Sequence, residues 1–235
     1  MDVLTWQNLV LFVAPLTGGL LALLFRHQAE NNYGVVLSFS GAFLFTAVLV
    51  DLFPPLFRNL SEAGLYLLAG FFFQILLEQL TRGIEHGHFP AQKMSYTTVS
   101  ALIIGLLTHA LLDGIPLAHH ELMAASHRPM LYAISLHKIP EGFALAMVLT
   151  ASGFCTSRVL GWILTLSLAA PLAVFFGSSL GQYRPDLLLA FIAFAVGSFL
   201  HVTTTVLYES EHPAHVVHWG RVAAIVAGAG LALLL

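Results

Sequence analysis

Four side chains that could bind a metal ion lie in two apolar stretches of the sequence. His109 and Asp113 occur four residues apart in SALIIGLLTHALLDGIPLAHH, and His137 and Glu141 repeat that spacing in LYAISLHKIPEGFALAMVLTA. In a helix, residues i and i+4 lie one turn apart on the same face. Two facing helices would therefore present two imidazoles and two carboxylates to one point. This set of nitrogen and oxygen ligands suits zinc or another divalent first-row metal.

A second explanation of the same residues is a buried structural network without metal. In a soluble helix, a His–Asp pair at this spacing is commonly a surface interaction. Apolar helices in a membrane lack that water-facing surface, and ionisable groups there are costly and commonly functional. Pro116 and Pro140 each remove a backbone donor and predict a kink beside the ligands. Gly114 and Gly142 follow the two carboxylates and allow either close helix approach or space for an ion.

The composition indicates which kind of protein must position these residues. Apolar residues make up 58% of the 235 residues and charged residues only 9%, whereas soluble domains carry roughly 25% charged residues. So little charge cannot cover a water-facing surface, which favours a multi-pass membrane protein embedded in a lipid bilayer. Nine Lys and Arg against twelve Asp and Glu, without a basic run, exclude a nucleic-acid partner. The single cysteine, Cys155, excludes a thiolate metal cluster.

The apolar segments predict an all-α fold, a bundle of eight transmembrane helices forming a single transporter domain over residues 1–235. A spanning helix needs about 20 apolar residues. Eight segments meet this requirement: 7–25, 34–57, 63–81, 96–120, 129–151, 158–181, 187–208 and 216–235.

The distribution of Lys and Arg predicts the orientation of these helices, because cytoplasmic loops carry an excess of basic residues. With the N-terminus outside, five basic residues lie on or near the inner side and three on the outer side. The inner ones are Arg26, Arg82, Lys93, Arg158 and Arg221, and the outer ones are Arg58, Arg128 and Arg184. This bias favours both termini outside, and we expect the inner membrane of a prokaryotic cell.

The sequence resembles the ZIP (Zrt/Irt-like) divalent metal-ion transporters. HKIPEGFA (137–144) resembles their fifth-helix signature and HALLDG (109–114) their fourth-helix signature. Residues 35–57, 169–181 and 195–210 resemble the second, sixth and seventh helices of the family. The resemblance implies an eight-helix fold and uptake of a divalent metal toward the cytosol, with the metal as substrate and with no catalytic cofactor. Homodimers are common in that family.

Carried onto this chain, the resemblance makes His109, Asp113, His137 and Glu141 the transport site. Many members bind a second ion beside it, at positions that are Ala110 and Lys138 here. We therefore expect a mononuclear site in which the ammonium of Lys138 is a fixed counter-charge to the two carboxylates. The alternative for Lys138 is that its side chain extends to the membrane interface.

Further polar residues are candidates for the ends of the pathway. Asp51, His119 and His120 would lie near the outer entrance, although adjacent helical residues such as the last two point apart. His201 and Glu209 lie two turns apart and run toward the cytosolic exit, where loop residues His86 and His88 could also bind metal. The alternatives are an interfacial carboxylate at Asp51 and solvated loop histidines.

These observations predict a divalent metal transporter, not an enzyme, that works by alternating access. Zinc is favoured because two imidazoles suit it, while iron, manganese, cobalt and cadmium fit the same ligand set. Three alternatives remain: a zinc-dependent intramembrane hydrolase, a proton-coupled solute carrier, and a membrane metal sensor that does not transport. The hydrolase lacks the HExxH motif, and a nucleotide-driven pump lacks the GxxxxGK[ST] motif.

Overall fold

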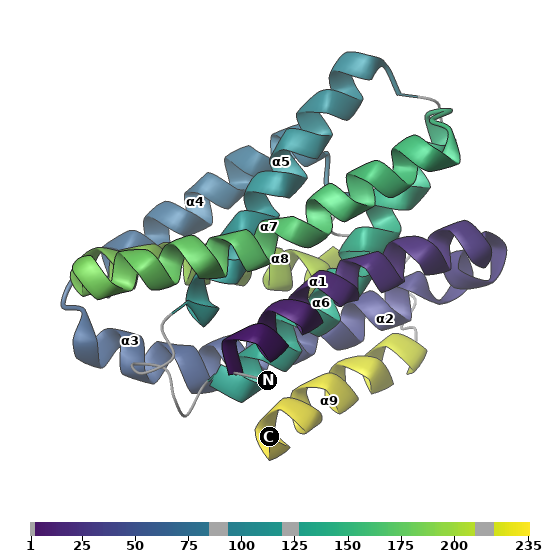
Figure 1. Cartoon of the computed structure of the whole chain (residues 1–235). Coiled ribbons are helices and arrows are strands. Elements are labelled where there is room, and N and C mark those ends of the chain that lie inside the picture. The colour runs from purple at the N-terminus through teal and green to yellow at the C-terminus, as the bar shows by residue number, and fades with distance from the viewer. Residues whose placement is uncertain (1–2, 85–93, 119–126, 210–218) are drawn as a thin grey trace.

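The computed structural model describes residues 3–84, 94–118, 127–209 and 219–235, and every element in them is helical (Figure 1). Most of these helices lie close to the ranges expected from the apolar segments, but α2 begins at Arg26, eight residues before the segment expected at 34–57. In chain order they are α1 (Val3–Leu24), α2 (Arg26–Ala47), η1 (Val48–Leu52), α3 (Phe53–Asn59), α4 (Ala63–Thr81), α5 (Tyr96–Gly114), η3 (Ile115–Leu117), α6 (His127–Ala151), α7 (Thr156–Tyr183), α8 (Pro185–Glu209) and α9 (Trp219–Leu234).

The second apolar segment is one helical run with a wider turn in its middle. The π-helical turn η1 joins α2 to α3, and the N–H of Phe53 donates to the carbonyl of Val48, five residues earlier. Pro54 and Pro55 follow directly. Because proline has no N–H and its ring clashes with the carbonyl four residues before it, the regular α-helical ladder cannot pass this point unchanged.

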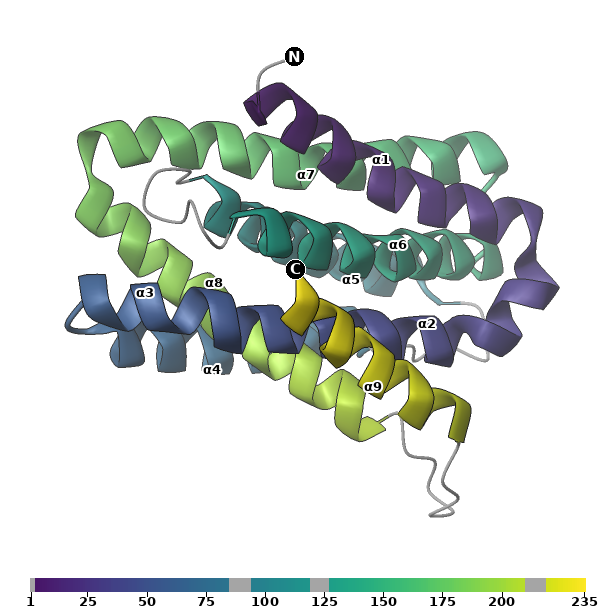
Figure 2. The same cartoon turned by 90° about the horizontal axis from the view of Figure 1, so that it is seen from below.

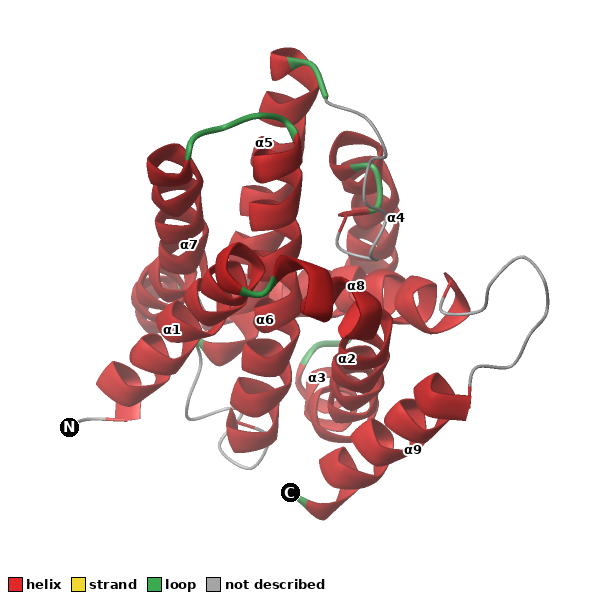
Figure 3. Ribbon diagram, turned by 90° about the vertical axis from the view of Figure 1, so that its right-hand side faces the viewer, coloured by secondary structure: helices red, strands yellow, loops and turns green. Residues whose placement is uncertain are grey.

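Six helical runs of the described residues are long and apolar enough to cross a membrane, so the chain is an integral membrane protein. They are Trp6–Leu24, Tyr33–Asn59, Ala63–Thr81, Tyr96–Leu117, Thr156–Tyr183 and Pro185–Tyr208. The last helix, α9, is shorter, with 16 residues. The other helix outside this set, α6, is buried over most of its length and lies near the middle of the bundle (Figure 3). Neighbouring helices cover it, and α6 can therefore carry charged residues.

Two helix pairs pack closely through reciprocal glycines. In the α1–α6 pair, Gly18 lies against the carbonyl of Ile139, and Gly142 lies against the carbonyl of Pro15. A Cβ atom at either glycine would overlap the opposite backbone. Small residues let membrane helices approach in this way. Of the two roles expected for Gly142, the structure therefore shows close helix approach.

The α4–α8 pair repeats this arrangement with Gly70 against the carbonyl of Phe194 and Gly197 against the carbonyl of Leu67. The helices form two groups by their contacts: α1, α5, α6 and α7 in one, and α2, α4, α8 and α9 in the other. Figure 2 shows α1 and α7 on one side of the bundle and α2 and α9 on the other. The predicted ligands belong to the first group.

Candidate metal centre

Helices α5 and α6 bring three of the four predicted ligands together in the interior. His109 and Asp113 lie one turn apart on α5, and Glu141 lies on α6. Each of these residues is at most 2% exposed. One potential ligand atom from each of the three lies within 4.8 Å of the other two. This spacing allows one ion to contact an imidazole nitrogen and two carboxylate oxygens.

The fourth predicted ligand, His137, lies beside this group without joining it. Its ring centroid is 6.1 Å from that of His109, and the two rings are nearly perpendicular, at 83°. The side chain is 1% exposed, and neither of its ring nitrogens has a hydrogen-bond partner among the described residues. Buried polar atoms in this state are costly, and a metal ion is one partner that would satisfy an imidazole nitrogen.

Lys138 connects the two carboxylates. Its Nζ lies 2.5 Å from Oδ2 of Asp113 on α5 and 2.5 Å from Oε2 of Glu141 on its own helix. The lysine is 1% exposed, so the structure does not support a side chain extended to the membrane interface. The ammonium thus lies between the carboxylates of Asp113 and Glu141, where two negative charges attract a cation. Below, the central cluster means His109, Asp113, His137, Lys138 and Glu141.

Comparison with known families bears directly on this cluster. The family model described as ZIP zinc transporter matches residues 85–235. The chain belongs to the ZIP zinc transporter family. Comparison with curated proteins found no match. Membership implies a divalent metal transporter, for which metal ions are the substrate, and the matched range contains all of the central cluster.

Both prolines near the candidate ligands have clear structural roles, although one expected helix was too long. The segment expected to run to residue 120 leaves the α-helical form at Gly114 and tightens into the 3₁₀ turn η3, which contains Pro116. In contrast, α6 continues through Pro140. The hydroxyl of Tyr33 on α2 donates to the carbonyl of Pro140 at 3.2 Å. This bond ties α2 to the backbone of α6 one residue before Glu141.

A polar contact at the end of η3 was not expected from the sequence. The side-chain amide of Gln7 on α1 donates to the carbonyl of Leu117 at 3.1 Å. The Gln7 Oε1 atom lies 2.6 Å from Nε2 of His127 at the start of α6. These bonds hold the ends of three chain segments together. A single Gln in an apolar helix was the available signal, because such a residue needs a partner inside the protein.

The expected entrance residues lie outside the group of three ligands or outside the described chain. Asp51 is part of η1 and is partly exposed. His119 and His120 fall outside the described residues, and so do the loop residues His86 and His88 expected at the exit. Their roles therefore stay predictions.

The expected exit residue His201 has a partner that the sequence did not reveal. Its Nε2 atom lies 2.6 Å from Oε2 of Glu78 on α4, and its ring packs edge-on against Phe71. One turn earlier, the Ser198 hydroxyl donates to Oε1 of Gln74 at 2.7 Å. We call Gln74, Glu78, Ser198 and His201 the α4–α8 polar cluster. Glu209 is the last residue of α8, and its pairing with His201 stays a prediction.

Proposed function

We propose that this ZIP protein moves Zn²⁺ toward the cytosol by alternating access through a mononuclear site in the central cluster. His109, Asp113 and Glu141 would be the first ligands, and His137 would complete a set of two imidazoles and two carboxylates. The observation that carries the proposal is the group of three ligand atoms within 4.8 Å of one another, buried between two helices. The two carboxylates supply negative charge for a divalent ion that has lost its water, and the ammonium of Lys138 offsets part of that charge.

Lys138 supports a site for one ion. In this proposal its ammonium replaces the second cation that many family members bind. Ala110, the other residue at that place, is fully buried and offers no ligand atom. The test is Lys138→Ala, for which we expect a change in the number of bound ions or in the uptake rate. If both stay unchanged, Lys138 is not a counter-charge.

The ring nitrogens of His109 and His137 support zinc as the substrate. Zinc binds imidazole nitrogen and carboxylate oxygen at similar distances, whereas harder ions prefer oxygen alone. Imidazole must lose its proton to bind metal, so we expect metal binding to weaken at acid pH.

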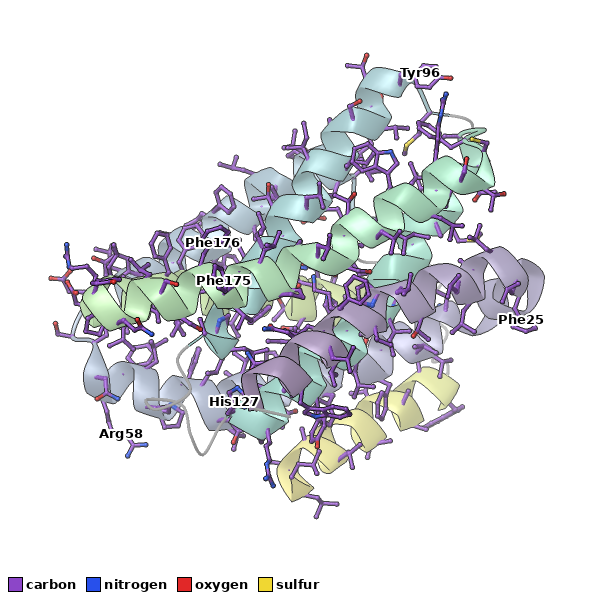
Figure 4. All side chains as sticks on the ribbon, in the orientation of Figure 1. Phe25, Arg58, Tyr96, His127, Phe175 and Phe176 are labelled. Carbon is purple, nitrogen blue, oxygen red and sulfur yellow. The ribbon has the colours of Figure 1, made fainter. Side chains whose placement is uncertain are left out.

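The proposal also includes the topology and the setting. All eight helical runs of the described residues, including α6 and α9, would cross the inner membrane of a prokaryote, with both termini outside, and two copies would form a homodimer. The basic-residue bias supports this orientation. In this topology successive helices would cross the membrane in alternating directions. Figure 4 agrees with this, since Phe25 and Tyr96 lie toward one end of the bundle and Arg58 and His127 toward the other.

The decisive experiment is ⁶⁵Zn²⁺ uptake by purified protein in liposomes. We expect uptake by the wild type and none by the double variant His137→Ala/Glu141→Ala. The matched control is Arg184→Ala/Asp186→Ala, which removes an exposed ion pair and should transport normally. If the wild type binds one zinc ion per chain without uptake, the carrier proposal is wrong and a metal sensor explains the site.

A further inference from the structure

An open apolar groove runs along the outside of the bundle between α1, α6 and α9. It has a volume of about 510 Å³. Val13 of α1, Ile139 of α6 and Leu231 of α9 form its walls, and Phe43 of α2 also lines it. The groove therefore lies between the two helix groups, with α1 and α6 from one and α2 and α9 from the other.

The groove faces lipid and not water. Val13 is 43% exposed and Leu231 40% exposed, and Val13 belongs to a helix that is long and apolar enough to cross the membrane. The hydroxyl of Thr17, which also lines the groove, donates to the carbonyl of Val13 in its own helix at 2.9 Å. This hydroxyl is therefore already satisfied, and the middle of the groove offers an incoming molecule mainly apolar contacts.

One end of the groove differs from the rest. Trp6 in the first turns of α1 and Tyr132 in the second turn of α6 line it there, 52% and 44% exposed. Leu235, which follows α9, also lines the groove. Trp and Tyr have an apolar ring and a polar tip, and they gather where hydrocarbon meets the headgroups. The groove is thus apolar along its length and is marked by Trp6 and Tyr132 at one end.

Two kinds of molecule suit an apolar groove on the lipid-facing surface: a helix of a second copy and a lipid tail. The aromatic residues at one end favour the lipid, because Trp and Tyr gather at the level of the headgroups, where an acyl chain begins. A lipid tail is narrow and flexible, and it is the molecule that the surrounding bilayer supplies.

We propose that this groove is a binding site for one acyl chain of a phospholipid, whose ester and headgroup lie at the Trp6–Tyr132 end. Binding does not depend on the proposed transport function. A second consequence does rest on it: Ile139 stands between Lys138 and Pro140, so the lipid tail contacts the turn of α6 that carries the central cluster. Movement of α1 and α6 against α2 and α9 would have to accommodate or expel the tail.

The test fills the groove and counts the bound lipid. Val13→Trp places a large ring in the groove, and Leu20→Trp is the matched control, because Leu20 is 40% exposed on the same helix and does not line the groove. Each protein is reconstituted in liposomes of equimolar phosphatidylethanolamine and phosphatidylglycerol, extracted in detergent and weighed by native mass spectrometry. We expect one retained phospholipid on the wild type and on the control, and about tenfold less on Val13→Trp, equivalent to ~1.4 kcal/mol.

Leu231→Trp, on the opposite wall, repeats the test should Val13→Trp fail to fold. Equal retention by the groove variants and the control would overturn the proposal, and so would a wild type without retained lipid. A dimer that only the groove variants disrupt would make a second copy the occupant instead. Zinc uptake is measured on the same preparations. A wild type that retains one lipid but takes up no zinc would count against the transport proposal alone, because lipid retention is read without metal.

Discussion

The central cluster and the α4–α8 polar cluster both join imidazoles and carboxylates across two helices, yet they differ in burial and in pairing. Asp113 and Glu141 are buried, and one ammonium contacts both. In the other cluster, the side chains of Glu78 and His201 are 22% and 12% exposed and pair with each other. His201 has a partner at 2.6 Å, whereas the ring nitrogens of His137 have none among the described residues.

The packing of the helices that carry the two clusters also differs. The backbones of α4 and α8 approach closely through Gly70 and Gly197, whereas no described glycine of α5 or α6 lies against the other of these two helices. A bound ion needs room between two helices and imidazole nitrogens that have no other partner. A structural contact instead needs two helix backbones in close approach and an imidazole that is already paired. We therefore propose metal binding for the central cluster and helix attachment for the α4–α8 polar cluster, and the following variants test that difference.

The largest effect is expected for Lys138→Met, which leaves two buried carboxylates without their cation. Removing one partner of a buried ion pair costs about 3–5 kcal/mol. Thermal unfolding in detergent without metal should show this loss. Added Zn²⁺ should raise the unfolding temperature of the variant more than that of the wild type, because bound ligand stabilises the folded state. Arg184→Met, at an exposed position, is the control. If zinc raised the unfolding temperatures of Lys138→Met and the wild type equally, the proposed role of the central cluster would be contradicted.

The next effect is expected for Gly197→Ala, because the added methyl overlaps the backbone of α4. Overpacking of this kind costs about 1–3 kcal/mol, again measured by thermal unfolding. Gly161→Ala is the control, since nothing lies within 4 Å of the added atom, and a helical Gly→Ala change there should stabilise slightly. Equal unfolding temperatures for the two variants would show that close packing of α4 on α8 is not what holds this pair.

A smaller effect is expected for Glu78→Gln in the α4–α8 polar cluster. The amide can still bond to His201, and partial exposure weakens the contribution of this contact, so a loss of about 1 kcal/mol is expected. Zinc uptake should stay close to that of the wild type, while Glu141→Gln should abolish it. Loss of uptake in both variants would place Glu78 on the transport pathway and remove the distinction between the clusters.

The smallest effect concerns Cys155, whose labelling tests the proposed orientation of the helices in the membrane. This exposed thiol follows α6, and the Ser157 hydroxyl at 3.4 Å and the backbone N–H of Arg158 lower its pKa. An impermeant maleimide should label it only from the cytosolic side. Ser157→Ala raises the pKa and should slow labelling a few-fold at neutral pH, because the thiolate reacts. Labelling from outside would reverse the proposed orientation.

Much of the fold followed from local patterns. Long apolar stretches separated by short polar loops predicted the helices, and α4 begins and ends where expected, at residues 63 and 81. Bilayer thickness and backbone hydrogen bonding determine helix length almost independently of neighbours. The i, i+4 spacing likewise placed His109 beside Asp113. The end of α5 was predicted less well, because Pro116 can either kink a helix or end it, and the choice depends on what its neighbours contact.

The sequence by itself therefore determined which residue types stand at membrane depth and which share a helix face. Only the tertiary structure decided their partners: that Lys138 reaches Asp113 on another helix, that His201 meets Glu78, and that His137 lies beside the group of three. The physical reason is that spacing along one helix is set by its 3.6-residue period, whereas contacts between helices depend on which faces pack. Those faces are chosen by small residues such as Gly18 and Gly197, whose close approaches appear only after the whole bundle has formed.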